Sequence, residues 1–310
     1  MVQIAGIIGP FGCRRGGALG LHHDLAAVRD RLGTNAVLLD HAATSVETRA
    51  DRAILTAGDE AIEARLVVAA DGIHSELRPF VFPPSKPVFH GTISYRGLIP
   101  RERLPDWPMD RWLMWAGPSK HFLVFPVRHG TMINYVGFVP TDEEMKESWS
   151  APGNPDKLRA EFEGWDPRIG EVLAQVDKCF RWALYDREPL PNWTKGCLTL
   201  LGDSAHPMLP HLGQGANQSI EDGMALATIL SKVDNAAVPT ALLAYERLRR
   251  ERVADVQRGA RQNGLRVDSM SDYADLRKRD AELAAHAEFR KHLYAYDVVP
   301  TAEAVAKALV

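Results

Sequence analysis

The stretch "LLGDSAHPMLPHLGQGAN", from Leu200 to Asn217, decides how this chain is interpreted. An apolar run stops at a Gly-Asp pair, a loop with two histidines and two prolines follows, and a Gly-Gln-Gly turn leads into a helical pattern. This order predicts a strand, a loop and a helix. In open α/β sheets, ligands bind beyond the carboxyl ends of the strands. The stretch therefore predicts a ligand site at its loop.

The residue types of this loop indicate what the ligand carries. Asp203 follows the predicted strand, where its carboxylate can accept two hydrogen bonds from the hydroxyls of a ribose or ribityl chain. Gly213, Gly215 and Ala216 have almost no side chain, so a ligand can approach the backbone closely. Their amides open a helix whose positive end favours negative charge. We expect a planar or phosphorylated ligand that carries hydroxyls and becomes electron-rich.

Length and composition exclude several classes of protein. The 310 residues are 45% hydrophobic and 25% charged, a balance typical of a globular protein with a sizeable core. The net charge of −3 argues against nucleic-acid binding, and no apolar run approaches the roughly 18 residues of a membrane span. Three scattered cysteines favour a reducing cytoplasm over a disulfide framework. The basic run "RLRRER" (Arg247–Arg252) predicts the solvated face of a helix.

A second apolar run ends in a similar way. Residues Leu66–Ala70 are continuously apolar and stop at Asp71-Gly72, which predicts a strand buried on both faces, as in a parallel sheet. Between the two runs the sequence is aromatic, β-rich and punctuated by turn residues, which predicts an antiparallel sheet. We therefore predict an α/β fold in which a discontinuous domain, 1–87 and 180–310, carries an inserted sheet domain, 88–179.

Both motifs resemble those of a known family. The stretch "GDSAHPMLPHLGQGANQSIED" (Gly202–Asp222) is similar to the flavin-binding Gly-Asp motif of class A flavoprotein aromatic hydroxylases. The stretch "LVVAADGIHSELRP" (Leu66–Pro79) is similar to their Asp-Gly motif, which serves the flavin and the nicotinamide donor. Further stretches, among them "SYRGLIP" and "RWALYDREPL", resemble the salicylate hydroxylase-like branch. The resemblance runs from about Leu21 to Asp297.

The resemblance implies a p-hydroxybenzoate hydroxylase-like fold, with a Rossmann-like FAD-binding domain and an inserted β-sheet substrate domain. It also implies an FAD-dependent monooxygenase that hydroxylates an aromatic ring, such as salicylate or a related aryl acid, with NAD(P)H and O₂. The implied cofactor-binding residues are Asp71, Gly72, Gly202, Asp203, Pro210, Gly213, Gln214, Gly215, Ala216 and Asn217. No metal site is expected, because the loop's Asp and His residues match no zinc spacing. The oligomeric state stays open, with a homodimer as one alternative.

Two positions are candidates for contact with the substrate. By resemblance, the Pro210 carbonyl contacts the flavin ring and His211 is directed at the substrate cavity, where an imidazole can serve as the base that ionises a phenol. A surface histidine is the equally weighted alternative for His211. In "HFLVFPV" the family strand often has a substrate-facing Tyr, whereas this chain has Phe125. His206 is predicted to be a structural hydrogen-bonding group.

One family feature has no counterpart in this sequence. Family members begin with a strand, G-x-G-x-x-G and a helix, whereas "GIIGPFG" (Gly6–Gly12) has the wrong glycine spacing and His22 stands at a position usually held by Arg. We therefore expect the chain to start after the first βαβ unit. The strand at Leu66–Ala70 would then lose one ladder partner and expose an edge, and the chain would retain FAD weakly or not at all and be poorly soluble. A truncated gene model is favoured. An evolved short form is the alternative to it. For the function, the alternatives to an aromatic hydroxylase are a non-catalytic remnant of such an enzyme and another flavin oxidoreductase of the same superfold.

Overall fold

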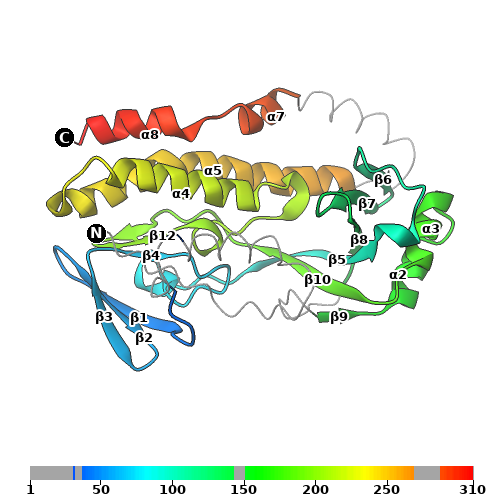
Figure 1. Ribbon diagram of the computed structural model, residues 1–310, viewed down its shortest axis with the longest axis horizontal. Helices are drawn as coiled ribbons and strands as arrows, with labels where there is room; N and C mark the ends of the chain where they lie inside the picture. Colours follow the sequence, from blue (N-terminus) through cyan, green and yellow to red (C-terminus); the bar gives the residue numbers. More distant parts are fainter. Residues whose placement is uncertain (1–30, 32–36, 143–150, 269–286, 310) are drawn as a thin grey trace. The chain divides into compact units, whose positions relative to one another are not determined.

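The computed structural model describes residues 31, 37–142, 151–268 and 287–309, so "GIIGPFG" and His22 lie outside the described residues. The chain forms two compact units (Figure 1). The first combines the residues up to Lys86 with Arg187–Arg261 and the residues from Phe289 onward, and the second combines Pro87–Asp186 with Gln262–Glu288. Each unit has its own hydrophobic core.

A short parallel pair of strands in the first unit ends at the two motifs. Strands β4 (Val67–Ala69) and β12 (Leu198–Leu200) run parallel and are buried along their whole length, as their continuous apolar runs predict. Strand β11 (Thr194–Lys195) pairs antiparallel with β12. Within the described part of the chain, β12 is the one ladder partner of β4, which makes β4 an edge strand.

The remaining elements lie wholly or for most of their length in the first unit. They are the antiparallel strands β1 (Ala43–Thr48), β2 (Ala53–Ala57) and β3 (Glu60–Ala64), the helices α4 (Gly215–Leu230), α7 (Ala287–Tyr294) and α8 (Val298–Lys307), and the 3-10 turns η2 (Arg78–Phe80), η4 (Gly202–Ser204), η5 (Pro210–Leu212) and η6 (Asn235–Ala237). The long helix α5 (Val238–Asp268) runs beside α4 (Figure 1). None of the described helices combines the length and hydropathy needed to cross a bilayer.

The buried stripe of α4 begins with polar residues. Gln218, Asp222, Ala225 and Ile229 recur at three- and four-residue spacing and face the core. Buried carboxylates on α4 require buried cations nearby, and α5 supplies them. The prediction of a solvated face at Arg247–Arg252 is accordingly wrong at two positions, because Arg249 and Arg252 are 0% and 9% exposed.

The second unit is built on a six-stranded antiparallel sheet with the order β6-β7-β8-β5-β10-β9. Its elements are β5 (Val88–Pro100), η3 (Arg101–Arg103), β6 (Leu113–Gly117), β7 (Lys120–Val127), β8 (Met132–Pro140), β9 (Ala151–Gly153), α2 (Pro155–Glu161), α3 (Pro167–Ala174) and β10 (Cys179–Asp186). Both helices start with an Asn or Asp cap followed by Pro, a sequence signal for a helix N-terminus. The predicted α/β class with an inserted antiparallel sheet is confirmed.

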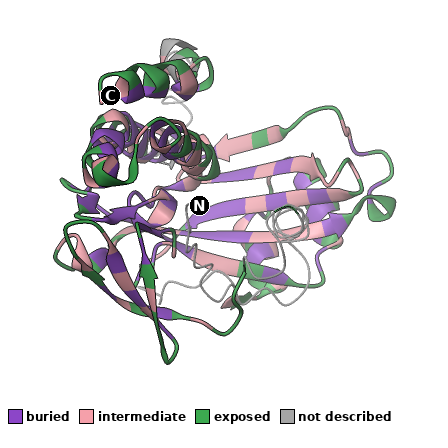
Figure 2. Ribbon diagram, turned by 60° about the vertical axis from the view of Figure 1, so that its left-hand side comes forward, coloured by how far each residue is buried: buried purple, intermediate pink, exposed green. Residues whose placement is uncertain are grey.

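Buried and half-buried residues both occur along β7 and β8, as the burial colours of the strands in Figure 2 show. Phe122, Ile133 and Tyr135 are at most 1% exposed and share a hydrophobic cluster with residues of α2 and α3. On the opposite face Phe125 lies across from Asn134, and both are half-buried. His121 and Phe138 on the same side are buried, so we call only the part around Phe125 and Asn134 the open face of the sheet.

Candidate functional site

The loops that follow β4 and β12 are joined by one buried arginine, Arg78. Its Nε donates to the Ser204 carbonyl at 2.6 Å, and its Nη2 donates to the Asp203 carbonyl at 3.0 Å. The same Nη2 donates to the carbonyls of Ile73 and Gly72 at 3.0 and 3.3 Å. The two motifs therefore form one site. Sequence reasoning missed Arg78, although an Arg that closes the quoted Asp-Gly stretch was a usable signal.

The Asp-Gly half of the site contains an unsatisfied oxygen beside open space. Asp71 accepts the Leu77 amide with Oδ2 at 3.2 Å, whereas its buried Oδ1 has no hydrogen-bond partner among the described residues. Gly72 has a φ of +82°, and a Cβ added there would have no described neighbour within 4 Å. A buried acceptor without a donor is costly, so this corner suits a ligand that brings a donor.

The Gly-Asp half turns sharply at the end of β12. Gly202 has a φ of +65°, and an added Cβ would lie 2.7 Å from the Ser219 Oγ, so only glycine fits between the turn and α4. The next residue, Asp203, is half-buried, and no described residue donates a hydrogen bond to its carboxylate. Burial raises the pKa of Asp203, and His206 and Arg78 offset this only in part.

The elbow before α4, Pro210 to Gln214, is bare on one side. Gly213 adopts the left-handed conformation with a φ of +62°, and its amide donates to the Pro210 carbonyl at 2.9 Å. A Cβ on Gly213 would meet no described atom within 4 Å. His211 is half-buried in the same elbow. The backbone here is accessible to a flat ligand, and substitution of Gly213 would fill that space.

The N-terminus of α4 lacks a side-chain cap. Gln214 precedes the helix but accepts no capping hydrogen bond, and no acidic residue lies in the first turn. The amides of Gly215, Ala216 and Asn217 are the first in the helix, where backbone donors have no intrahelical acceptor. The Asn217 side chain turns back to the Gly213 carbonyl at 3.4 Å. A 16-residue helix thus presents its positive end with room for negative charge.

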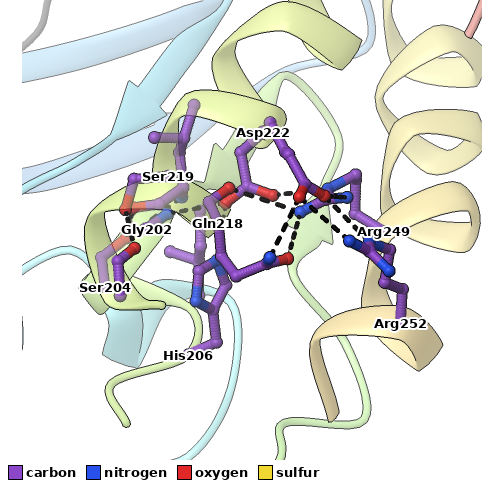
Figure 3. A network of polar contacts seen from close by, with 12 residues as sticks. Gly202, Ser204, His206, Gln218, Ser219, Asp222, Arg249 and Arg252 are labelled. Carbon is purple, nitrogen blue, oxygen red and sulfur yellow. Dashed lines mark hydrogen bonds and ion pairs between the residues drawn. The ribbon is translucent and has the colours of Figure 1, made fainter. Parts of the chain in front are cut away.

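A buried carboxylate of α4, Asp222, contacts the turn after β12 (Figure 3). The Asp222 Oδ2 accepts the Gly202 amide at 3.1 Å and lies 2.6 Å from the His206 Nε2. Burial favours a raised pKa for Asp222, but His206 and Arg249 outweigh it and lower the pKa. The prediction that His206 is a structural hydrogen-bonding group is confirmed. Phe125, the other substrate candidate, belongs to the second unit and lies on its open face.

Comparisons with known proteins agree on one family. The family model described as FAD binding domain matches residues 21–260. A 3-amino-4-hydroxybenzoate 2-monooxygenase of Streptomyces platensis is 36% identical over 263 residues, 84% of this chain and 66% of that protein. A 6-hydroxynicotinate 3-monooxygenase of Bordetella bronchiseptica is 34% identical over 68% of this chain and 56% of its own length. The chain thus spans at most about two thirds of these relatives.

A solved structure shares the fold. The chain is similar to a salicylate hydroxylase substrate complex with a TM-score of 0.79 and 27% identity, over 93% of this chain and 75% of the other. A Klebsiella pneumoniae HpxO structure with FAD and uric acid, at 24% identity and a TM-score of 0.70, has the same fold.

Proposed function

Because this chain belongs to the FAD binding domain family, among its aromatic monooxygenases, we propose that it hydroxylates a small aromatic substrate with FAD, NAD(P)H and O₂. The relatives named above act on benzoate and nicotinate rings that carry a hydroxyl group. A hydroxylated aryl acid is therefore the substrate class that we propose. A cytoplasmic location and a homodimer stay predictions from the sequence.

The single observation that carries the proposal is that each of the two motifs contains a glycine whose backbone is left uncovered. Gly72 and Gly213 both have positive φ angles and both face space that no described atom fills. Such a pair suits a ligand that contacts main-chain atoms at two points. FAD has the required shape, because a flat ring system continues into a hydroxylated chain and a phosphate-linked nucleotide.

The polar atoms of the site fit the same ligand. Asp203 would accept hydrogen bonds from the hydroxyls of the ribityl chain, which would remove the destabilisation that its burial causes. The orphaned Oδ1 of Asp71 would accept another donor. The amides of Gly215, Ala216 and Asn217 would face the electron-rich edge of the flavin, where a helix N-terminus contributes about 0.3–1 kcal/mol.

Bound FAD would supply the oxidation chemistry, carrying electrons from NAD(P)H to O₂ for insertion of oxygen into the ring. The protein's own residues would bind, orient and deprotonate the substrate. The imidazole of His211, beside Pro210 in the elbow, would take the proton of a ring hydroxyl, since an ionised phenol reacts more readily with an electrophilic oxygen. In the sheet unit taken by itself, Phe125 is the proposed apolar contact for an aromatic substrate, and Asn134 lies across from it on the neighbouring strand.

A direct test measures flavin first and turnover second. The full chain is purified with added FAD, its absorbance near the flavin band is recorded after gel filtration, and NAD(P)H oxidation is followed with 3-amino-4-hydroxybenzoate, 6-hydroxynicotinate or salicylate. We expect FAD that binds weakly but titrates to saturation, and substrate-dependent NAD(P)H oxidation with a hydroxylated product. A folded chain that binds no FAD at any concentration would overturn the proposal.

A further inference from the structure

Arg249 is completely buried, and every arm of its guanidinium contacts α4 (Figure 3). Its Nε donates to the Asp222 Oδ1 at 2.8 Å, and its Nη1 donates to Glu221 at 2.6 Å. Its Nη2 donates to the side-chain and backbone oxygens of Gln218 at 2.8 and 3.3 Å. Arg249 of α5 therefore binds three polar side chains of α4. Those of Gln218 and Asp222 are buried, and that of Glu221 is half-buried.

The first arm of this network leads to the Asp203 turn. Asp222, which is held by Arg249, accepts the Gly202 amide with its other oxygen and contacts His206 on the far side of the turn. Gly202 immediately precedes Asp203, so the Asp222 carboxylate holds the backbone before Asp203, while Arg78 binds the Asp203 carbonyl.

The second arm leads to the elbow. The Gln218 Nε2 donates to the Gln214 Oε1 at 3.2 Å, and Gln214 is 2% exposed between Gly213 and the first turn of α4. Arg249 orients the Gln218 amide by binding its oxygen, which leaves the nitrogen pointed at Gln214. The guanidinium of Arg249 therefore supports both the elbow, through Gln218, and the Asp203 turn, through Asp222.

The charges of the network explain why an arginine is needed. Glu221 and Asp222 oppose Arg249 and Arg252, and Arg252 makes two further bonds to Glu221 at 2.9 and 3.0 Å. The planar fork of a guanidinium reaches three acceptors at fixed angles, whereas the single ammonium of a lysine cannot. A lysine at position 249 would keep the charge balance and lose the geometry.

We propose that Arg249 is a positioning residue that sets, from α5, the placement of the Asp203 turn relative to the Gly213–Gln214 elbow, and thereby the affinity of the site for FAD. This inference depends on the proposed function. Gln218, Asp222 and Arg249 are all 0% exposed, so they would act on FAD affinity through the backbone that they hold and not by contact with the ligand.

The test compares Arg249→Lys with Arg258→Lys, a matched control on the same helix whose partner Asp255 is exposed. FAD affinity is measured by fluorescence titration of the full chain at a temperature where circular dichroism shows both variants folded. We expect the Kd of Arg249→Lys to rise about 10- to 100-fold, with a changed visible spectrum of the bound flavin, and that of Arg258→Lys to stay within about twofold.

Asp222→Asn, which keeps the shape of the side chain, provides a second variant if Arg249→Lys does not fold. It should weaken FAD binding in the same direction, because it disturbs the arm to Gly202. A folded Arg249→Lys or Asp222→Asn with the wild-type Kd and flavin spectrum would overturn this inference alone. A wild-type chain that binds no FAD would overturn the proposed function and this inference together.

Discussion

Arg78 and Ser204 are 126 positions apart in the chain, yet the Arg78 Nε donates to the Ser204 carbonyl at 2.6 Å. This bond connects the loop after β4 with the loop after β12, on either side of the inserted sheet. Three further carbonyls of the same two loops accept from the same guanidinium. The two motifs are far apart in the sequence, but they form a single site in the folded chain.

Arg78→Lys is expected to loosen both loops. A lysine cannot bind four carbonyls, and buried oxygens left without donors cost about 1–3 kcal/mol each before relaxation. We expect the free energy of unfolding to fall by roughly 2–4 kcal/mol in urea titrations, with weaker FAD binding. Arg111→Lys, at an exposed ion pair with Asp110, should leave both unchanged. Equal unfolding curves for Arg78→Lys and wild type would contradict the bridging role.

Asp203→Asn should have opposite effects on stability and on binding. The raised pKa of Asp203 means that ionisation of its carboxyl group destabilises the fold. The stability associated with the neutral carboxyl group is therefore fully present below its ordinary pKa of about 3.9, and it is lost as the pH rises through the raised value. The asparagine variant should therefore unfold at a higher temperature than wild type at pH 7, with a difference that vanishes towards pH 4.

The same variant should bind FAD about 10- to 100-fold more weakly, because a neutral acceptor replaces a charged one. Thermal scans between pH 4 and pH 8 and an FAD titration at pH 7 check both parts. A stability difference that persists below pH 4, or an unchanged Kd, would argue against this account of Asp203.

Gly213→Ala tests the bare elbow. The left-handed φ of +62° makes alanine cost about 1 kcal/mol, and the new methyl group would enter the space proposed for the flavin. Gly164→Ala is the matched control, because Gly164 has a φ of +77° and equally open surroundings in the second unit. Both should lose similar stability in calorimetry, whereas only Gly213→Ala should weaken FAD binding. Equal FAD affinity in the two variants would place the flavin elsewhere.

His211→Gln separates catalysis from binding. If His211 removes the proton of a ring hydroxyl, its loss should lower kcat by about 10²–10⁴-fold and flatten the acidic limb of the pH–rate profile. FAD affinity should stay near the wild-type value, because the elbow glycines are unchanged. Stopped-flow measurement of product formation across pH checks this. An unaltered pH profile would favour the alternative, in which His211 is a surface histidine with no part in catalysis.

Phe125→Tyr tests the open face of the sheet. The added hydroxyl would lie across from Asn134, where it can join a hydrogen bond to a polar ring substituent. One such bond is expected to change KM for hydroxylated aryl acids by up to about tenfold, with little effect on the Kd for FAD. Steady-state kinetics with salicylate and 6-hydroxynicotinate would show it. Identical KM values for both substrates in both proteins would remove Phe125 from the substrate site.

Short local patterns in the sequence were sufficient to predict the family, the fold class and the parallel pair of strands. Two apolar runs that end in Asp71-Gly72 and Gly202-Asp203 predicted strands buried on both faces, and β4 and β12 are such a pair. The resemblance of both motifs to the class A flavoprotein hydroxylases is confirmed by the family match. These features are readable because hydrophobic period and turn residues act over a few neighbouring positions.

The tertiary structure alone decided which charged residues support the site. The basic run at Arg247–Arg252 predicted a solvated face, yet Arg249 and Arg252 are buried against carboxylates of α4. Arg78 likewise acquires its role from carbonyls some 125 positions away. A charge pattern along one helix does not state which partner the helix will meet, and the free energy of a buried ion pair depends on that partner. The motifs were therefore determined locally, and the residues that hold them together were determined by packing.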